Sequence, residues 1–287
     1  GQRRVEPGEF EIFVGGGQKL KLRTQYGSKR KEYGISLVEP WFLDRKLSLG
    51  IDLFRDEVEY DEYSLKRTGG SLSLSHPLPG PNRLTYKYGL EREQITDVSD
   101  TNLYYNVDTG EEYSFTREED DITTSMFTLS LKHDTRDNPF IPTRGNRSVL
   151  EAYVAGGVLG FENDIYGGSV RSSQYVPLWL GHVFSLSGRA ETVDCYGDND
   201  EVSISDRLFL GGGNSLRGFD YRDVGPKVYR ETTDGGIYHR PIGGQSLAAL
   251  TAEYTVPVVQ GIRLASFYEA GNVWDEAFEF DTDVLAT

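Results

Sequence analysis

Apolar and polar residues alternate with a period of two along most of this chain, and this pattern most strongly constrains its fold. The stretches Lys19–Arg23 (KLKLR), Ser71–Ser75 (SLSLS) and Arg83–Leu90 (RLTYKYGL) each place apolar and polar side chains on opposite faces. Successive side chains of a β-strand point to opposite sides of its sheet, so the pattern predicts amphipathic strands. We expect eleven strands, at residues 17–27, 30–40, 46–60, 63–76, 82–97, 121–134, 147–159, 163–178, 181–195, 244–259 and 261–274.

Composition helps to distinguish a soluble sheet from one embedded in a membrane. Only 37% of the residues are hydrophobic and the mean hydropathy is −0.48, yet the chain holds 18 Tyr, 14 Phe and 33 Gly. No apolar run approaches the ~20 residues of a membrane-spanning helix, whereas a barrel strand needs an apolar residue only at alternate positions. We therefore predict an all-β fold, an antiparallel transmembrane β-barrel. A soluble β-sandwich or propeller is the alternative, although no propeller-type repeat is present.

The connections between the predicted strands also favour a barrel. Short turns, for example at residues 27–29, 77–81 and 180–182, contrast with long polar segments at about 98–120 and 196–243. Bacterial outer-membrane barrels have short periplasmic turns and long external loops. Such single-chain barrels contain an even number of strands. Eleven predicted strands therefore lead us to expect that further strands lie outside this sequence.

Charge and motif content exclude several classes of function. A net charge of −15 argues against a nucleic-acid partner, because phosphate binding requires clustered Lys and Arg. The single Cys195 cannot form an internal disulfide. His133, Asp134 and Asp137 lie close together in the sequence but lack the spacing of a metal site. No nucleophile elbow, zinc-protease motif, phosphate loop or dinucleotide motif is present. We expect a protein that is not an enzyme and uses no cofactor and no metal.

Two stretches combine turn-forming residues with charged or aromatic side chains. In residues 133–145 (HDTRDNPFIPTRG), proline and glycine fix a strand exit and a tight turn, while carboxylates can accept hydrogen bonds from turn amides. The turn-motif residues are Asp134, Arg136, Asp137, Pro142 and Gly145. Residues 39–45 (EPWFLDR) contain Trp41 and Phe42, and Trp274 ends the last predicted strand. Because aromatic side chains gather at membrane interfaces, we expect these three to be interfacial anchors.

One long predicted loop contains an arginine among glycines. Residues 208–226 read LFLGGGNSLRGFDYRDVGP, with Arg217 near the centre. Glycines allow such a backbone to pack closely against strands. Alternation in the last two predicted strands places Glu253 and Glu269 on the face opposite to the apolar side chains. Both carboxylates are therefore expected to point into the interior of the predicted barrel.

Four of these stretches resemble motifs of the BamA-like family of outer-membrane assembly barrels. They are residues 39–45, residues 133–145, the Arg-Gly-Phe loop, and the last predicted strand, where Glu269 stands in place of the family's usual Asp. In that family the loop folds back into the barrel and its arginine pairs with inward carboxylates. Arginine suits this role because its five donors can bridge two carboxylates. The resemblance implies a loop latch made of Arg217, Gly218, Phe219, Glu253 and Glu269.

The resemblance also implies a domain organisation. A BamA-like barrel has sixteen strands and follows periplasmic POTRA domains. Residues 1–287 are then expected to form a partial C-terminal transmembrane β-barrel domain, with the POTRA domains outside the sequence. The first two strands, apart from an end near residues 10–14, and the last three strands are expected to lie outside it as well.

The implied function is the folding and insertion of β-barrel proteins in the bacterial cell outer membrane. An exposed strand edge templates the incoming strand through backbone hydrogen bonds. Implied partners are unfolded outer-membrane proteins, outer-membrane lipids and lipopolysaccharide. Accessory lipoproteins and periplasmic chaperones are expected to act through the POTRA domains. The alternatives are a TamA-like factor or two-partner secretion translocator, and a passive diffusion porin.

Overall fold

The computed structural model describes residues 9–13, 17–60, 63–98, 103–197, 199–231, 234–259, 261–281 and 285–286, with only the backbone described for residues 9–13 and 117. Twelve strands form one sheet, in the order β1-β2-β3-β4-β5-β6-β9-β10-β11-β12-β15-β16. Their bounds are β1 Glu9–Phe13, β2 Lys19–Tyr26, β3 Arg30–Glu39, β4 Ser48–Glu59, β5 Ser64–Pro77, β6 Asn82–Thr96, β9 Asp120–Asp134, β10 Gly145–Ala155, β11 Ile165–Pro177, β12 Val183–Cys195, β15 Ser246–Val259 and β16 Ile262–Trp274. The predicted all-β antiparallel architecture is confirmed.

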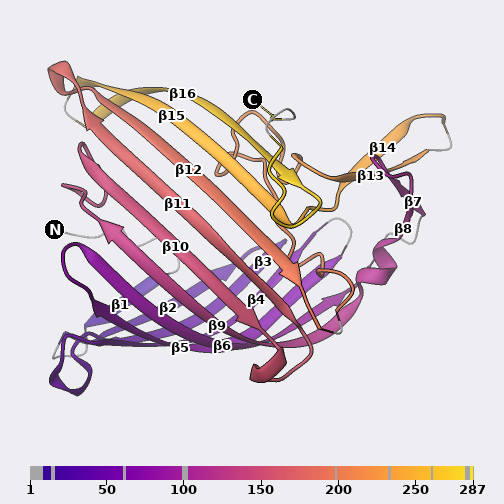
Figure 1. Ribbon diagram of the computed structural model, residues 1–287, viewed down its shortest axis with the longest axis horizontal. Coiled ribbons are helices and arrows are strands. Elements are labelled where there is room, and N and C mark those ends of the chain that lie inside the picture. Colours follow the sequence, from indigo (N-terminus) through magenta and orange to yellow (C-terminus); the bar gives the residue numbers. More distant parts are fainter. Residues whose placement is uncertain are drawn as a thin grey trace.

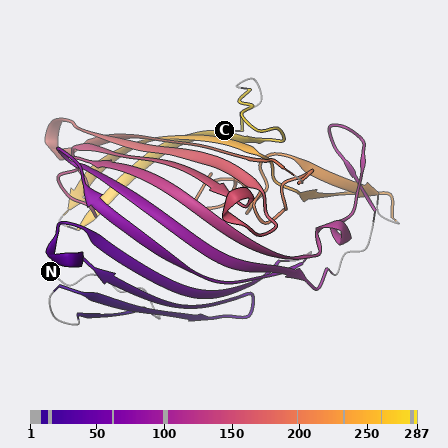
Figure 2. The ribbon, with the colours of Figure 1, turned by 60° about the horizontal axis from the view of Figure 1, so that its bottom comes forward.

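The large sheet curls around a central space. In Figure 1, β10, β11 and β12 cross the front of the molecule while β3 and β4 lie behind them, and Figure 2 shows the strands running obliquely around the curve. Among the described residues no pairing joins β1 to β16, so the sheet is open there. No helix in the described part of the chain has the length and apolar character needed to cross a membrane.

Alternation in the sequence becomes a sheet with two different faces because neighbouring strands pair in register. Leu72 of β5 pairs with Tyr88 of β6, and Tyr88 pairs with Phe127 of β9. These three apolar side chains are 53%, 40% and 37% exposed on the outer face. Arg67 of β5 and Glu93 of β6 form an ion pair on the opposite, inner face. An extended apolar surface of this kind is suited to contact with lipid.

Both long connections lie at the same end of the sheet. The connections β3–β4, β5–β6, β9–β10, β11–β12 and β15–β16 are short and lie at one end, on the left in Figure 1. The long β6–β9 and β12–β15 connections share the other end, together with the short turn at residues 27–29. Short 3-10 helices occupy three of the turns, at Phe42–Asp44 (η1), Gly157–Leu159 (η3) and Trp179–Gly181 (η4).

The two long connections build a second, smaller sheet that the alternation pattern did not predict. Its order is β14-β13-β7-β8 and it extends beyond the large sheet, on the right in Figure 1. The bounds are β7 Tyr104–Asn106, β8 Glu112–Tyr113, β13 Lys227–Glu231 and β14 Ile237–Pro241, with the 3-10 helix η2 at Phe115–Glu118. The β6–β9 and β12–β15 connections are therefore joined by backbone pairing between β7 and β13.

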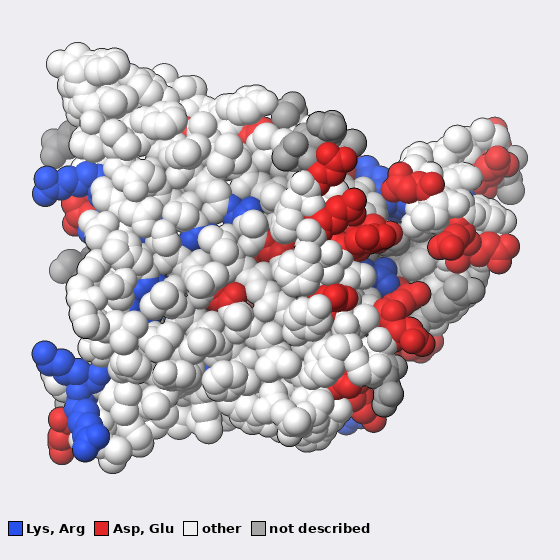
Figure 3. All heavy atoms as spheres, in the orientation of Figure 1, with Lys and Arg blue, Asp and Glu red and all other residues white. Residues whose placement is uncertain are grey.

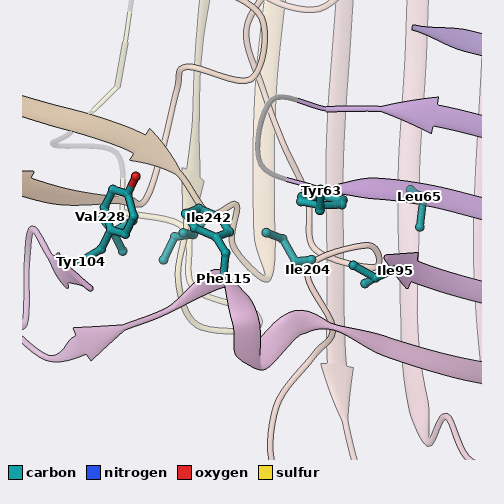
Figure 4. Close-up of a cluster of buried hydrophobic side chains, with 8 residues drawn as sticks. All are labelled: Tyr63, Leu65, Ile95, Tyr104, Phe115, Ile204, Val228 and Ile242. Carbon is teal, nitrogen blue, oxygen red and sulfur yellow. The ribbon is translucent and has the colours of Figure 1, made fainter. Parts of the chain in front are cut away.

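A buried hydrophobic cluster lies where these connections meet the wall of the large sheet. Strand residues pack with residues of both long connections in Figure 4. The members of the cluster are Tyr63, Leu65, Ile95, Tyr104, Phe115, Ile204, Val228 and Ile242. This core fixes the connection between β12 and β15, residues 196–245, which we call the β12–β15 loop.

Candidate functional site: the latch of the β12–β15 loop

The β12–β15 loop folds back over the inner face of the sheet. Leu210, Leu216 and Val224 of the loop pack against Leu247 of β15 and Val273 of β16. All five side chains are at most 6% exposed. Leu247 and Val273 occupy the alternate positions that the sequence pattern assigned to the interior. Burial of these apolar groups attaches the loop to the last two strands of the sheet.

Arg217 is bound to Glu269 of β16 through both its backbone and its side chain. Its backbone N–H donates to Glu269 Oε2 at 2.7 Å, while its Nε and Nη2 donate to Oε1 at 2.9 Å and 2.6 Å. Thr251 of β15 donates to the same Oε1 at 3.2 Å. The Glu269 side chain is only 8% exposed and that of Arg217 is 32% exposed. A nearly buried carboxylate is thus neutralised and supplied with several donors, as a buried charge requires.

The Arg217 guanidinium has two further neighbours at different distances. Its central carbon lies 3.2 Å from the centroid of the Phe267 ring, a cation–π contact. Glu253 is farther away, with 3.9 Å between Arg217 Nη1 and Glu253 Oε2. In the register, Glu253 stands opposite Phe267, whereas Thr251 stands opposite Glu269. The structure therefore places Arg217 on Glu269, with Glu253 at the limit of ion-pair distance.

Glycines shape the loop around the arginine. Gly218 has a φ of +92°, and no atom would lie within 4 Å of a Cβ there, so backbone conformation accounts for the glycine. Phe219 packs against the cluster that contains Leu210, and its carbonyl accepts a hydrogen bond from the Gly212 N–H at 3.1 Å. On β16, a Cβ on Gly271 would lie 3.0 Å from the Leu210 side chain. Small residues therefore let the loop approach the strand closely.

Polar contacts also hold the loop to a distant part of the sheet, and spacing in the sequence gave no signal for them. Nη2 of Arg67 on β5 donates to the carbonyl oxygen of Ser205 at 3.1 Å. Asp206 accepts a hydrogen bond from Asn163 Nδ2 at 2.9 Å. Burial raises the pKa of Asp206 to about 6, and the neighbouring Glu93 carboxylate adds to the rise. In the sheet order β5 is the fifth strand and β16 the twelfth, so the loop contacts widely separated strands.

The turn between β9 and β10 is a hydrogen-bonded unit built on two aspartates. Asp134 accepts from Arg136 Nε at 2.9 Å and from Arg136 Nη2 at 3.0 Å. Asp137 accepts from the Thr143 hydroxyl at 2.5 Å and from the backbone N–H groups of Thr143 and Arg144 at 2.9 Å and 3.2 Å. The Thr143 hydroxyl and these amides hold the pKa of Asp137 below its usual range. The aspartates thus have partners within the turn itself.

Gly145 and Pro142 lie in the last part of the same turn. Gly145 has a φ of +100°, and a Cβ on it would collide with the carbonyl oxygen of Thr135. Only glycine fits both the conformation and the close approach. The motif residues therefore come together at the short-turn end of the sheet, away from the β12–β15 loop.

The three aromatic residues expected to be anchors differ in exposure. Trp41, in the β3–β4 turn, is 53% exposed, and Phe42 beside it is partly exposed. Trp274 is only 6% exposed. Its ring centroid lies 5.6 Å from that of Phe280, which belongs to the segment that follows β16 and packs on the indole. Trp274 is therefore buried, because a later segment packs against it that alternation along the strand does not reveal, and its role as an interfacial anchor stays a prediction.

Acidic side chains gather at the end of the molecule that carries the long connections (Figure 3). A cavity of about 870 Å³ at this end is lined in part by Glu111, Glu118, Glu162 and Asp275. Arg207 of the loop partly compensates this charge, with its Nη2 3.2 Å from Glu118 Oε1. Within the described residues, no group of three or more His, Cys, Asp or Glu side chains is arranged to hold a metal ion. A surface of this charge repels anionic partners such as nucleic acids.

The large sheet is curved, with an apolar outer face, short turns at one end and a loop folded onto its inner face. These features define the class of transmembrane β-barrels. Within that class, the chain belongs to the Omp85 superfamily, whose domain profile matches residues 13–284. Barrels of this family lie in the outer membrane of bacteria or of mitochondria. The family relationship indicated by the sequence motifs is thereby confirmed.

Several named proteins are similar to the chain over most of its length. It is 26% identical to the outer membrane protein assembly factor BamA of Nitratidesulfovibrio vulgaris, over 96% of this chain and 33% of the relative. It is 24% identical to BamA of Neisseria meningitidis, over 96% of this chain and 36% of the relative. A SAM50-like protein of Schizosaccharomyces pombe is 27% identical, over 90% and 53% of the two chains. The chain thus spans about a third of these BamA relatives, whose names denote assembly factors and not enzymes.

Solved structures give the same fold. The crystal structure of BamA from Haemophilus ducreyi lacking POTRA domains 1–3 has a TM-score of 0.75 and 22% identity, covering 93% of this chain and 54% of that one. CdiB from Acinetobacter baumannii has a TM-score of 0.52 and 12% identity, covering 96% and 47%. The sheet described above therefore has the fold of the BamA barrel, and it fits that structure better than CdiB.

Proposed function

We propose that this chain belongs to a bacterial outer-membrane assembly factor that folds and inserts β-barrel proteins. One observation carries this proposal: the β12–β15 loop lies on the inner face of a sheet whose outer face is apolar, and Arg217 binds it there to Glu269. A loop held in this way limits how far the last strands can move relative to the rest of the wall. The names of the BamA relatives support the same function.

The proposed mechanism requires no covalent chemistry. A barrel whose terminal strands pair weakly exposes backbone N–H and C=O groups at an edge, and a client strand can pair with them. In lipid an unpaired backbone is costly, so completion of the client's hydrogen bonds favours insertion without a nucleotide. The latch would keep the loop folded onto the inner face of the barrel while a client strand pairs with the exposed edge. Its residues are Arg217, Gly218, Phe219, Glu253 and Glu269.

We also propose that residues 1–287 are part of the C-terminal barrel domain of a longer protein. This rests on the share of the BamA relatives that the chain spans. The proposed partners are unfolded outer-membrane proteins and the surrounding lipids, including lipopolysaccharide. Accessory lipoproteins and periplasmic chaperones would bind through POTRA domains, of which the Haemophilus BamA structure lacks the first three.

The experiment uses the full-length protein that carries this chain, reconstituted in liposomes. An unfolded barrel client is added, and its folding is followed by protection from protease. The wild-type protein should accelerate folding relative to empty liposomes, and Arg217→Ala should lose much of the acceleration and lower the heat stability. Arg92→Gln is the matched control, because Arg92 pairs with Asp121 on the outer face and is 60% exposed.

Other outcomes would assign the chain to another class. High steady ion conductance with no effect on client folding would indicate a porin. Passage of a secreted polypeptide across the liposome membrane, again without client insertion, would indicate a translocator. Either result, or no acceleration by the wild-type protein, would refute the proposed function.

A further inference from the structure

Another arginine of the β12–β15 loop, Arg222, lies among aromatic rings. Its guanidinium carbon is 3.6 Å from the centroid of the Phe209 ring and 4.5 Å from that of Tyr60. Its Nη1 donates to the hydroxyl of Tyr63 at 3.2 Å. Tyr63 is only 3% exposed, and the Tyr60 and Tyr63 rings are 4.9 Å apart. Phe209 belongs to the loop and the two tyrosines to the β4–β5 connection, so Arg222 joins segments far apart in the sequence.

The backbone of Arg222 is in a conformation that its side chain does not favour. Its φ is +64°, in the left-handed region where a Cβ crowds the backbone. A residue other than glycine keeps such a conformation when surrounding contacts fix it. On backbone grounds alone glycine would fit better at this position. The contacts of the Arg222 side chain therefore outweigh the strain.

Arg217 and Arg222 reach different parts of the sheet from one short segment. Arg217 contacts β16, the twelfth strand of the sheet order, while Arg222 contacts the connection between β4 and β5, the fourth and fifth strands. The chain between them forms turns that backbone hydrogen bonds hold, from the Gly212 N–H to the Phe219 carbonyl at 3.1 Å and from the Arg222 N–H to the Gly211 carbonyl at 3.4 Å. A displacement of the chain at Arg222 therefore also disturbs the turn that carries Arg217. The segment between them thus links β16 to the β4–β5 connection of the large sheet.

We infer that Arg222 is a positioning residue for the latch: by fixing the loop to the β4–β5 connection, it sets the place at which Arg217 meets Glu269. Arginine suits this position because its planar guanidinium can stack on rings while its edge donates a hydrogen bond. Lysine has a compact ammonium group that cannot stack in this way. The geometry of the latch does not depend on the proposed function, and only its consequence for assembly rests on it.

The test is hydrogen exchange in the full-length protein in lipid nanodiscs. The Arg217 amide is the reporter, because this N–H donates directly to Glu269 at 2.7 Å. Arg222→Gly removes the side chain and also relieves the backbone strain. If only the backbone mattered, exchange at Arg217 would stay the same or become slower. A positioning role predicts exchange at least tenfold faster, with the β15 and β16 strand amides unchanged.

Three further variants separate the contributions. Tyr63→Phe removes only the hydroxyl acceptor and should give a smaller increase in exchange at Arg217. Arg222→Lys keeps the charge but loses the stacking, so it should resemble Arg222→Gly and not the wild type. Arg92→Gln removes an exposed arginine elsewhere and should change nothing. Should Arg222→Gly fail to fold, Tyr63→Phe and Arg222→Lys decide the question with the same reporter.

The outcomes separate this inference from the proposed function. An Arg217 amide that exchanges at the wild-type rate or more slowly in Arg222→Gly would overturn the positioning role. Client folding is measured on the same samples. If exchange accelerates while client folding is normal, the positioning role stands and the proposed dependence of assembly on the latch fails.

Discussion

Replacing Arg217 with alanine should release the β12–β15 loop, and the size of the effect can be worked out from the site. The change leaves the Glu269 carboxylate, 8% exposed, with one backbone N–H and the Thr251 hydroxyl as donors. Removing one partner of a buried ion pair costs about 3–5 kcal/mol. Because the Arg217 side chain is 32% exposed, water screens part of this interaction. We therefore expect roughly 2–3 kcal/mol for opening of the loop.

Hydrogen exchange measures this free energy directly. The Val224 amide donates to the Leu210 carbonyl within the loop at 3.0 Å, so its exchange requires local opening. With about 1.4 kcal/mol for each factor of ten, Arg217→Ala should accelerate exchange at Val224 by roughly 30- to 140-fold. Amides in β10 and β11, which do not contact Arg217, provide the internal control.

A double-mutant cycle tests whether the effect comes from the ion pair. Glu269→Gln alone should cost less than Arg217→Ala, because the released guanidinium can turn toward water. The double variant Arg217→Ala/Glu269→Gln should cost less than the sum of the single changes by about 1–2 kcal/mol. Additive effects, or an acceleration at Val224 below threefold in Arg217→Ala, would refute the assignment of Arg217 and Glu269 as the main attachment.

Three other expected outcomes follow from the geometry. The pKa of Asp206 is raised to about 6, so its contribution to loop docking is full below its unfolded-state pKa and is lost as pH rises through 6. Protection of the loop amides, measured as exchange relative to the intrinsic rate at each pH, should increase between pH 7.5 and 5, and Asp206→Asn should abolish this increase. Gly271→Ala places a Cβ 2.7 Å from the Ala248 carbonyl oxygen and should lower stability by about 1–3 kcal/mol, measured by urea unfolding. Asp137→Ala should lower the melting temperature. Because the pKa of Asp137 is lowered, the wild-type advantage should fade as pH falls through that pKa, and a constant advantage would contradict this explanation.

The strands could be predicted because each carries its own evidence of alternation. The prediction at 30–40 became β3 at Arg30–Glu39, and that at 82–97 became β6 at Asn82–Thr96. The prediction at 147–159 ran too far, since β10 ends at Ala155 where Gly156 and Gly157 adopt positive φ. Periodicity finds the body of a strand, but local backbone conformation determines its end.

The small sheet shows where periodicity fails. Its strands contain two to five residues, which is too few for alternation to be recognised. Pairing joins β7 to β13 across more than a hundred residues of sequence. Nothing within either segment identifies the other. Both long connections therefore look like polar loops in the sequence alone, although they pair in the structure.

Register explains why the two predicted carboxylates are unequal partners of Arg217. Alternation tells which face Glu253 and Glu269 share, but not how far along the sheet each one lies. Glu253 pairs opposite Phe267, two residues from Glu269 on β16. Two residues of a strand correspond to about 6.6 Å, so the guanidinium that contacts Glu269 at 2.6 Å lies farther from Glu253, at 3.9 Å. Cross-strand register, which the sequence leaves open, thus decides between them.

Arg217 and Arg222 differ in how far their partners can be predicted from the sequence. Glu269 lies on a strand, where alternation alone places it on the inner face. Tyr60 and Tyr63, the partners of Arg222, flank a turn where no periodicity defines a face. A positive φ is equally invisible in the sequence. The attachment to the β4–β5 connection therefore emerges only from the fold, and substitutions there should loosen Arg217 even though they lie far from every recognised motif of the loop.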